Sequence, residues 1–209
     1  AAMLAAPSAE HLFGTDQYGR DVFSRIVYGA RTALAVGILS SLVGCTIGAL
    51  VGATSGYFGG RIDNAIQRLV DVMLSFPIIV LAMVVVAVLG KRPVFGVDVN
   101  LIVAIALPFI PKMARVARSA TLAIVQMPFI DAARAAGFSH ARIILRHIAP
   151  NIVAPYLIMA TAFIAQAILL EASLSFLGLG VTEPTPAWGL MLSGKAADFY
   201  KEAPWMILF

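Results

Sequence analysis

The run TALAVGILSSLVGCTIGALVGATSGYFGG, residues 32–60, decides the fold class of this 209-residue chain, because it contains no charged side chain. A helix needs about 20 mostly apolar residues to cross the hydrocarbon core of a bilayer. This run is longer than that, and further uncharged runs occupy residues 72–90 and 148–170. The sequence therefore predicts an all-α membrane protein, a polytopic bundle of helices.

The composition of the whole chain agrees with this prediction. Apolar residues make up 60% and charged residues 12% of the chain, whereas soluble domains have about 45–50% and about 25%. The balance excludes a disordered chain and a small disulfide scaffold. A single cysteine and three scattered histidines predict no internal disulfide and no metal site.

We expect membrane spans at about residues 32–54, 70–90, 99–118 and 150–171, with another span beginning at 204–209. The third span reaches full length only if Lys112 and Arg115 extend their charged groups to the membrane interface. The apolar run at 204–209 stops as it begins. We therefore expect residues 1–209 to form one membrane domain that lacks its first span and most of its last.

Basic residues indicate the orientation of these spans, because cytoplasmic loops carry an excess of Lys and Arg. The segment 112–147 contains six basic residues against one acid, Asp131. Those six are Lys112, Arg115, Arg118, Arg134, Arg142 and Arg146. This balance places the loop at about 119–149 on the cytoplasmic side, and residues 1–31, 91–98 and 178–203 on the outer side.

Four glycines repeat at a four-residue interval within the first span. They are Gly44, Gly48, Gly52 and Gly56. Residues four apart share one face of a helix, and small residues there let a second helix approach closely. The spacing predicts a tight helix–helix contact, although small residues are also common in membrane helices generally.

Three features resemble binding or catalytic sites, and each also has a simpler structural interpretation. Residues 189–196, GLMLSGKA, match a phosphate-binding loop except that Ala196 replaces the hydroxyl residue that binds Mg²⁺, so no nucleotide site is predicted. Glu171 lies near the outer end of its span and is expected to have a structural role there, with a proton relay as the alternative. His140 and His147 share a helix face, without a third metal ligand.

The segment 127–151, MPFIDAARAAGFSHARIILRHIAPN, is the strongest candidate for function. Asp131 begins a short helix that is rich in alanine, and Gly137 is expected to end it. Ser139 can cap a second helix, which Pro150 is expected to stop. We call residues 131–150 the knuckle. Its small side chains would let it enter a partner's groove, whereas an ordinary interfacial helix is the alternative interpretation.

At these residues the chain resembles a known family. The pattern of Asp131, Ala132, Ala133, Gly137 and Pro150 resembles the EAA loop of ABC importer permeases, with Asp in place of the leading Glu. Three further stretches resemble the C-type subunit of the dipeptide/oligopeptide/nickel class. They are FGTDQYGRDVFSR at 13–25, GYFGGRID at 56–63, and LSFLGLG at 174–180 followed by PTPAWG at 184–189.

The resemblance implies a type I ABC importer (MetI-like) permease fold in the bacterial or archaeal inner membrane. It implies a heterodimer with a second permease, two cytoplasmic ATPase subunits that bind ATP and Mg, and an extracytoplasmic substrate-binding protein. This chain itself would bind no cofactor and no nucleic acid, and its surroundings would be membrane lipid. Peptides or related small solutes would be the substrates.

The resemblance also implies roles for individual residues. The ATPase-coupling loop would contain Asp131, Ala132, Ala133, Arg134, Gly137, Phe138, Ser139 and Pro150. The outer gate, or the side that meets the binding protein, would contain Asp16, Arg20, Asp21, Glu171 and Trp188. A secondary transporter or channel subunit, driven by an ion gradient through Glu171, is the alternative function.

Overall fold

The computed structural model describes residues 3–90, 92–94, 97–193, 198–199 and 201–208. Its main elements are helices, in the order α1 (Val22–Phe58), α2 (Gly60–Leu74), α3 (Ile78–Leu89), α4 (Val99–Ala106), α5 (Phe109–Val125), α6 (Pro128–Ala135), the single turn α7 (His140–Ile143) and α8 (Val153–Phe176). Two short helices follow, α9 (Trp188–Met191) and α10 (Trp205–Leu208). The strands β1 (Pro93–Val94) and β2 (Val97–Asp98) form a two-residue antiparallel ladder.

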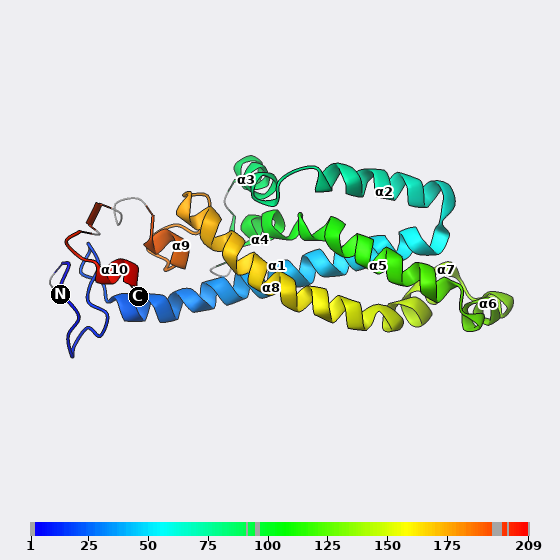
Figure 1. The fold of residues 1–209 in the computed structure, drawn as a ribbon, viewed down its shortest axis with the longest axis horizontal. Coiled ribbons are helices and arrows are strands. Elements are labelled where there is room, and N and C mark those ends of the chain that lie inside the picture. Colours follow the sequence, from blue (N-terminus) through cyan, green and yellow to red (C-terminus); the bar gives the residue numbers. More distant parts are fainter. Residues whose placement is uncertain (1–2, 91, 95–96, 194–197, 200, 209) are drawn as a thin grey trace.

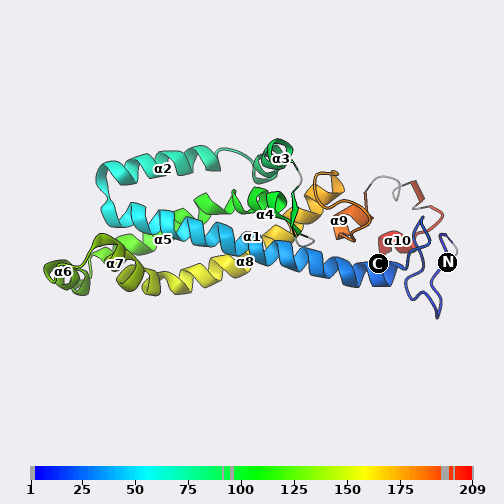
Figure 2. The same ribbon diagram turned by 180° about the vertical axis from the view of Figure 1, so that it is seen from behind.

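α1 is the axis of the molecule, and α4, α5 and α8 pack along it. Figures 1 and 2 show both termini, α9 and α10 at one end, and α6 at the other. We call these the terminal end and the α6 end. At about 1.5 Å per residue, the 37 residues of α1 extend well beyond a hydrocarbon core of about 30 Å.

Two of the expected spans are bent. α2 and α3 meet at 92°, and α4 and α5 meet at 45°. Pro77 precedes α3 and disfavours helical geometry in the residue before it. Pro108 precedes α5, where Leu107 stays helical, and the missing N–H of Pro108 removes one helical hydrogen bond at the bend. Within the described residues, two helices are long and apolar enough to cross a membrane, or up to four if each bent pair counts as one span.

The glycine face of α1 lies directly against α5. A Cβ atom added to Gly44 would lie 2.9 Å from the Cβ of Phe109, and one added to Gly56 would lie 2.9 Å from the Cβ of Thr121. A Cβ on Gly52 would overlap the carbonyl oxygen of Ala114. The helix backbones therefore approach as closely as they do only because these positions have no side chain.

The interface between α1 and α8 differs from that between α1 and α5, because it includes side-chain hydrogen bonds. Ser41 donates a 2.6 Å hydrogen bond to the carbonyl of Ala160, and Thr46 Oγ1 lies 3.0 Å from the hydroxyl of Tyr156. Between α5 and α8, the rings of Phe109 and Phe163 stack with centroids 4.5 Å apart. These contacts close the interior between three helices.

Candidate functional site

The knuckle forms the tip of the molecule at the α6 end. In both views α6 lies beyond the ends of α1, α5 and α8 (Figures 1 and 2). Ile130 and Ala133 are buried and hold α6 against the rest of the chain. The other side of α6, with the residue that follows it, is exposed. Its exposed side chains include Ala132, Ala135 and Ala136 together with Phe129, Asp131 and Arg134. The three alanines of this surface offer a partner close contact with the helix backbone.

The turn after α6 depends on its backbone geometry. Gly137 has a φ of +76°, and a Cβ added there would meet nothing within 4 Å. Glycine is therefore favoured at this position by conformation and not by space. Ser139 then begins α7, because its hydroxyl accepts a 3.4 Å hydrogen bond from the N–H of Arg142.

Aromatic contacts join the knuckle to the end of α1. The Tyr57 hydroxyl lies 2.9 Å from Nδ1 of His140, and the guanidinium of Arg134 lies 5.5 Å from the centre of the Tyr57 ring. Phe138 packs between the guanidinium of Arg142, at 4.0 Å, and the ring of His147, at 5.7 Å. A displacement of the knuckle would therefore be transmitted to the end of α1 through these contacts.

The prediction that Pro150 stops the second helix is wrong. The chain passes through a π-helix at Ile144–Ile148 and a 3₁₀ turn at Ala149–Ile152 into α8. Residues His140–Phe176 act as one continuous helix of 37 residues. Pro150 lacks a backbone N–H, and the local change of helix type accommodates it without a break. The knuckle is therefore α6 together with the first turns of the helix that continues into α8.

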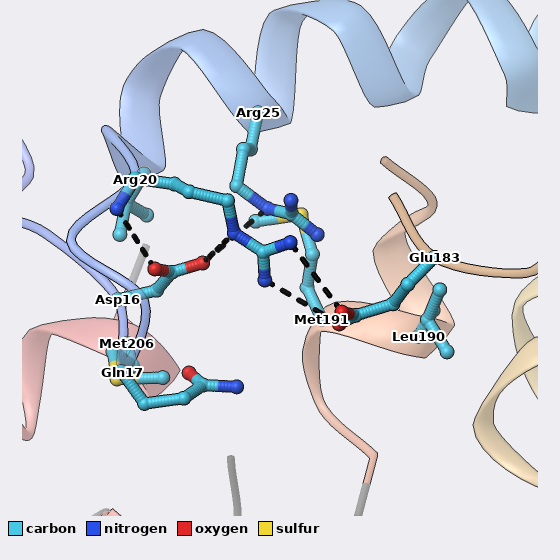
Figure 3. A pocket seen from close by; sticks show the side chains of 9 residues that line it. Asp16, Gln17, Arg20, Arg25, Glu183, Leu190, Met191 and Met206 are labelled. Atoms are coloured by element: carbon cyan, nitrogen blue, oxygen red, sulfur yellow. Dashed lines mark hydrogen bonds and ion pairs between the residues drawn. The ribbon is translucent and has the colours of Figure 1, made fainter. Parts of the chain in front are cut away.

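A second candidate lies at the terminal end, where Asp16, Arg20, Arg25 and Glu183 line a cleft (Figure 3). The Asp16 carboxylate accepts a 2.7 Å hydrogen bond from Nε of Arg20 and also accepts from the backbone N–H groups of Tyr18 and Arg20. Nε of Arg25 lies 3.7 Å from the same carboxylate.

Arg20 links two distant segments of the chain. Its two Nη atoms lie 3.4 and 3.5 Å from the carboxylate of Glu183, which is 163 residues away in sequence. The side chain of Glu183 is half exposed, whereas Arg25 is buried, with only 8% of its surface exposed. The network therefore ties the segment before α1 to the loop that follows α8.

Asp21 begins α1. Its carboxylate accepts a 2.7 Å hydrogen bond from the N–H of Ser24 and lies 3.0 Å from Nδ1 of His11. The hydrogen bond from Ser24, followed by the contact with His11, holds the pKa of Asp21 below its ordinary value. Asp21 is therefore a structural cap, and its contact with His11 is part of the same folded segment.

The two remaining predicted outer residues are Trp188 and Glu171. The indole N–H of Trp188 donates a 3.1 Å hydrogen bond to the carbonyl of Ile26, so α9 is fixed against α1. Glu171 lies near the terminal end of α8, but only 1% of its area is exposed, and it accepts a 2.7 Å hydrogen bond from Ser175. The sequence places Glu171 at this end, and the structure adds that it is enclosed by other residues.

Two further observations concern metal binding and the segment that matches a phosphate-binding loop. Within the residues that the structure describes, no group of three or more His, Cys, Asp or Glu side chains could hold a metal ion. Residues 194–196 of the segment that matches a phosphate-binding loop lie outside the described part of the chain.

The comparison with protein families decides the identity of the chain. Residues 44–208 match the family described as "Binding-protein-dependent transport system inner membrane component". The chain belongs to this family. Its resemblance to importer permeases is therefore confirmed, and the family description places it in an inner membrane as one component of a transport system.

Two curated relatives cover nearly all of the chain. The dipeptide transport system permease protein DppC of Alkalihalophilus pseudofirmus is 45% identical over 99% of this chain and 66% of its own length. The glutathione transport system permease protein GsiD of Escherichia coli is 47% identical over 92% of this chain and 62% of its own length. The chain thus spans somewhat less than two thirds of the length of these family members.

A solved structure confirms the fold of this family member. The inward-facing MetNI methionine ABC transporter superposes with a TM-score of 0.61 and 20% identity, covering 89% of each chain. The prediction of an all-α, MetI-like permease fold is therefore correct. The two relatives are named as permease proteins of transport systems, not as ATPases.

The structure adds four residues to those predicted for the sites. They are Arg25 and Glu183, which line the cleft, and Lys112 and Gln166, whose side chains are joined by a 3.4 Å hydrogen bond. Arg25 stands inside the quoted stretch at 13–25, but its burial is visible only in the structure. Lys112 carried a signal in the sequence, since it is a charged residue at the edge of a short apolar run. Gln166 carried no such signal, because a single amide side chain in an apolar span forms no recognisable sequence pattern.

Proposed function

We propose that this chain is a membrane-spanning permease subunit of an ATP-driven importer for dipeptides or glutathione-type peptides. It forms part of the translocation path and couples through the knuckle to a separate ATPase. Its partners are a second permease subunit in a heterodimer, two cytoplasmic ATPase subunits that bind ATP and Mg, and an extracytoplasmic substrate-binding protein. The chain crosses the cell membrane several times, with the knuckle in the cytoplasm and the terminal end outside.

One observation carries this proposal: the relatives named for dipeptide and glutathione transport are 45–47% identical over almost the whole chain. The shape of the molecule supports it. α6 protrudes past every other helix and offers exposed alanines. A protruding helix of this kind suits a groove in a partner.

The structure suggests how coupling would work. Closure of the ATPase pair would displace α6, and the contacts of Tyr57 with Arg134 and His140 would pass this motion to α1. The helix that contains α7 is continuous with α8, so the same displacement would reach the span on the other side. This is a rigid-body transfer of motion between packed elements. At the terminal end, the Arg20–Glu183 contact would meet the binding protein or shape the outer gate.

The experiment uses the complete transporter in liposomes, with bulky residues on the exposed face of α6. We expect Ala132→Leu and Ala136→Leu to lower ATP-dependent peptide uptake at least tenfold and to weaken binding of the ATPase subunits. Membrane insertion should be unchanged. Ala65→Leu is the matched control, because Ala65 is an exposed helical alanine outside the knuckle, and its uptake should stay within twofold of the original.

Two results would contradict the proposal. One is normal uptake with both α6 variants when the ATPase subunits still co-purify. The other is loss of uptake in Glu171→Gln together with no response to ATP, which would restore the ion-gradient alternative.

A further inference from the structure

Lys112 is a charged residue whose surroundings differ from those of the neighbouring arginines. Its Nζ donates a 3.4 Å hydrogen bond to Oε1 of Gln166, so the contact joins α5 to α8 across 54 residues of sequence. Both side chains are half-buried. Arg115 and Arg118, which follow on the same helix, each form an ion pair, with Asp71 and Asp63 respectively.

Lys112 lies beside the middle of the uncharged stretch of α1. Gly48 contacts Ile110 and Met113, which flank Lys112 in sequence. Gly48 is 17 residues from Arg31 and 13 from Arg61, the nearest charged residues of the chain on either side. At about 1.5 Å per residue, Arg31 is about 25 Å from Gly48 along the axis of α1, and the end of α1 at Phe58 is about 15 Å away in the other direction. The backbone of Lys112 is therefore at the depth of the membrane interior.

The side chain points further into the span. Gly44 contacts Phe109 and Gly56 contacts Thr121, so α5 runs parallel to α1. Side chains in a helix tilt toward its N-terminus, and the N-terminus of α5 lies toward the terminal end. Lys112 therefore extends away from the α6 end and reaches Gln166. This differs from the sequence-based expectation that Lys112 extends to the interface, because the helix direction opposes it.

Within the described part of the chain, the ammonium group of Lys112 has no charged partner. Among the residues that the structure describes, ion pairs within 4.0 Å are formed by other basic groups, and none involves Lys112. An ammonium has three N–H donors, and Gln166 Oε1 uses one of them. A charge at this depth is costly unless it is paired or faces a watery cavity. The free donors of Lys112 and the amide N–H₂ of Gln166 together suit an anion that accepts two hydrogen bonds.

We propose that Lys112 and Gln166 form a binding point for the carboxylate of the transported peptide, within the translocation path. The inference rests on the proposed function, since dipeptides and glutathione all have a free carboxylate at neutral pH. As the peptide passes, its carboxylate accepts from Nζ of Lys112 and from the amide of Gln166, and it leaves when the path opens to the other side. The same chemistry could come from an acidic side chain of the second permease subunit, and the experiment separates the two sources.

The experiment measures ATP-dependent uptake by the complete transporter in liposomes, with alanyl-alanine, glutathione and alanyl-alanine amide as probes. We expect Lys112→Met to lower uptake of the free acids at least tenfold at subsaturating concentration and to leave uptake of the amide within twofold. Lys112→Arg should keep at least a third of the uptake, because it keeps the charge. Gln166→Glu should also lower uptake of the free acids, since its carboxylate would occupy Lys112.

Arg115→Met is the matched control. It removes the same charge one turn further along α5, from an exposed ion pair with Asp71, and should change the uptake of acid and amide equally and by less than twofold. The binding protein is the same in every comparison, so its own preference for acids cancels in the ratio of variant to original.

Three outcomes would overturn the inference. If Lys112→Met lowers uptake of acid and amide equally and weakens assembly of the two permeases, the anion belongs to the partner subunit. If Lys112→Met keeps the original preference for the acid, the residue binds no carboxylate during transport. If the unaltered transporter takes up none of the three probes but retains ATPase activity, the proposed function fails, and the inference fails with it.

Discussion

The two ends of this molecule use the same pair of residue types in opposite ways. At the terminal end, Asp16 and Arg20 form a 2.7 Å ion pair in which the Asp16 side chain is 7% exposed. At the α6 end, Asp131 and Arg134 form a 3.3 Å ion pair in which the Asp131 side chain is 73% exposed. The sequence spacing is nearly the same, but one pair is enclosed by other segments and the other faces solvent.

The difference shows what each end is built to do. The enclosed network links residues on both sides of the fold through Arg20 and Glu183, so it holds segments together. The exposed pair joins two residues of α6, with only the Arg134 guanidinium also lying over the ring of Tyr57, and it leaves the alanines of α6 available to a partner. Exposed ion pairs contribute little to stability, whereas removing one partner of an enclosed pair leaves an unpaired charge.

The largest expected effect comes from breaking the enclosed network. Asp16→Ala should lower the free energy of unfolding by about 3 kcal/mol, because it leaves Arg20 and Arg25 without their shared carboxylate. Asp131→Ala should lower it by less than about 1 kcal/mol. Both values can be measured by denaturant titration of the protein in detergent micelles. Equal effects of the two variants would remove the contrast between the ends.

The second prediction tests positions where the two ends should behave alike. Gly137 and Gly178 have φ values of +76° and +79°, and an added Cβ would meet nothing within 4 Å at either position. Alanine at either position should therefore cost about 1–2 kcal/mol of stability, through backbone strain alone. The same titration measures this cost. A cost at one end only would show that contacts, and not the backbone, decide these turns.

The third prediction compares the helix caps of the two ends. Asp21 caps α1 with a 2.7 Å hydrogen bond, and Ser139 caps α7 with one of 3.4 Å. Alanine at either position should cost about 1 kcal/mol at neutral pH, or less for the longer bond. Unfolding titrations of both variants at pH 7 measure these costs.

The pH dependence separates these two caps. The pKa of Asp21 is lower in the folded chain than its ordinary value, so its carboxylate stabilises the fold above that ordinary value, about 4. This contribution is lost as the pH falls through the lowered pKa. The cost of Asp21→Ala should therefore shrink between pH 7 and pH 3, whereas that of Ser139→Ala should stay constant. A cost of Asp21→Ala that does not change with pH would show that the carboxylate is not the stabilising group.

Much of the fold was predictable, because long uncharged runs have few alternatives to membrane helices. The glycine spacing at 44–56 indicated a close contact in advance, although not that α5 would be the neighbour. The positions of Gly137 and Ser139 indicated the turn of the knuckle. Where the prediction was wrong, as at Pro150, local residue preference was outweighed by the continuation of a long helix into α8.

The candidate sites were less predictable, because their residues are far apart in sequence. Arg20 lies 163 residues from Glu183, and Lys112 lies 54 residues from Gln166. A single sequence carries no signal for such pairs. The burial of Glu171 is of the same kind, since the surrounding residues are contributed by other segments.

The sequence by itself determined that this chain lies in a membrane and which loop is rich in basic residues and alanine. These properties follow from hydropathy, charge and backbone preference, which act over a few neighbouring residues. Only the tertiary structure decided which charges are enclosed, which are exposed, and that Lys112 points into the span. Those outcomes depend on the direction and packing of whole helices, and packing brings together residues that the sequence keeps apart.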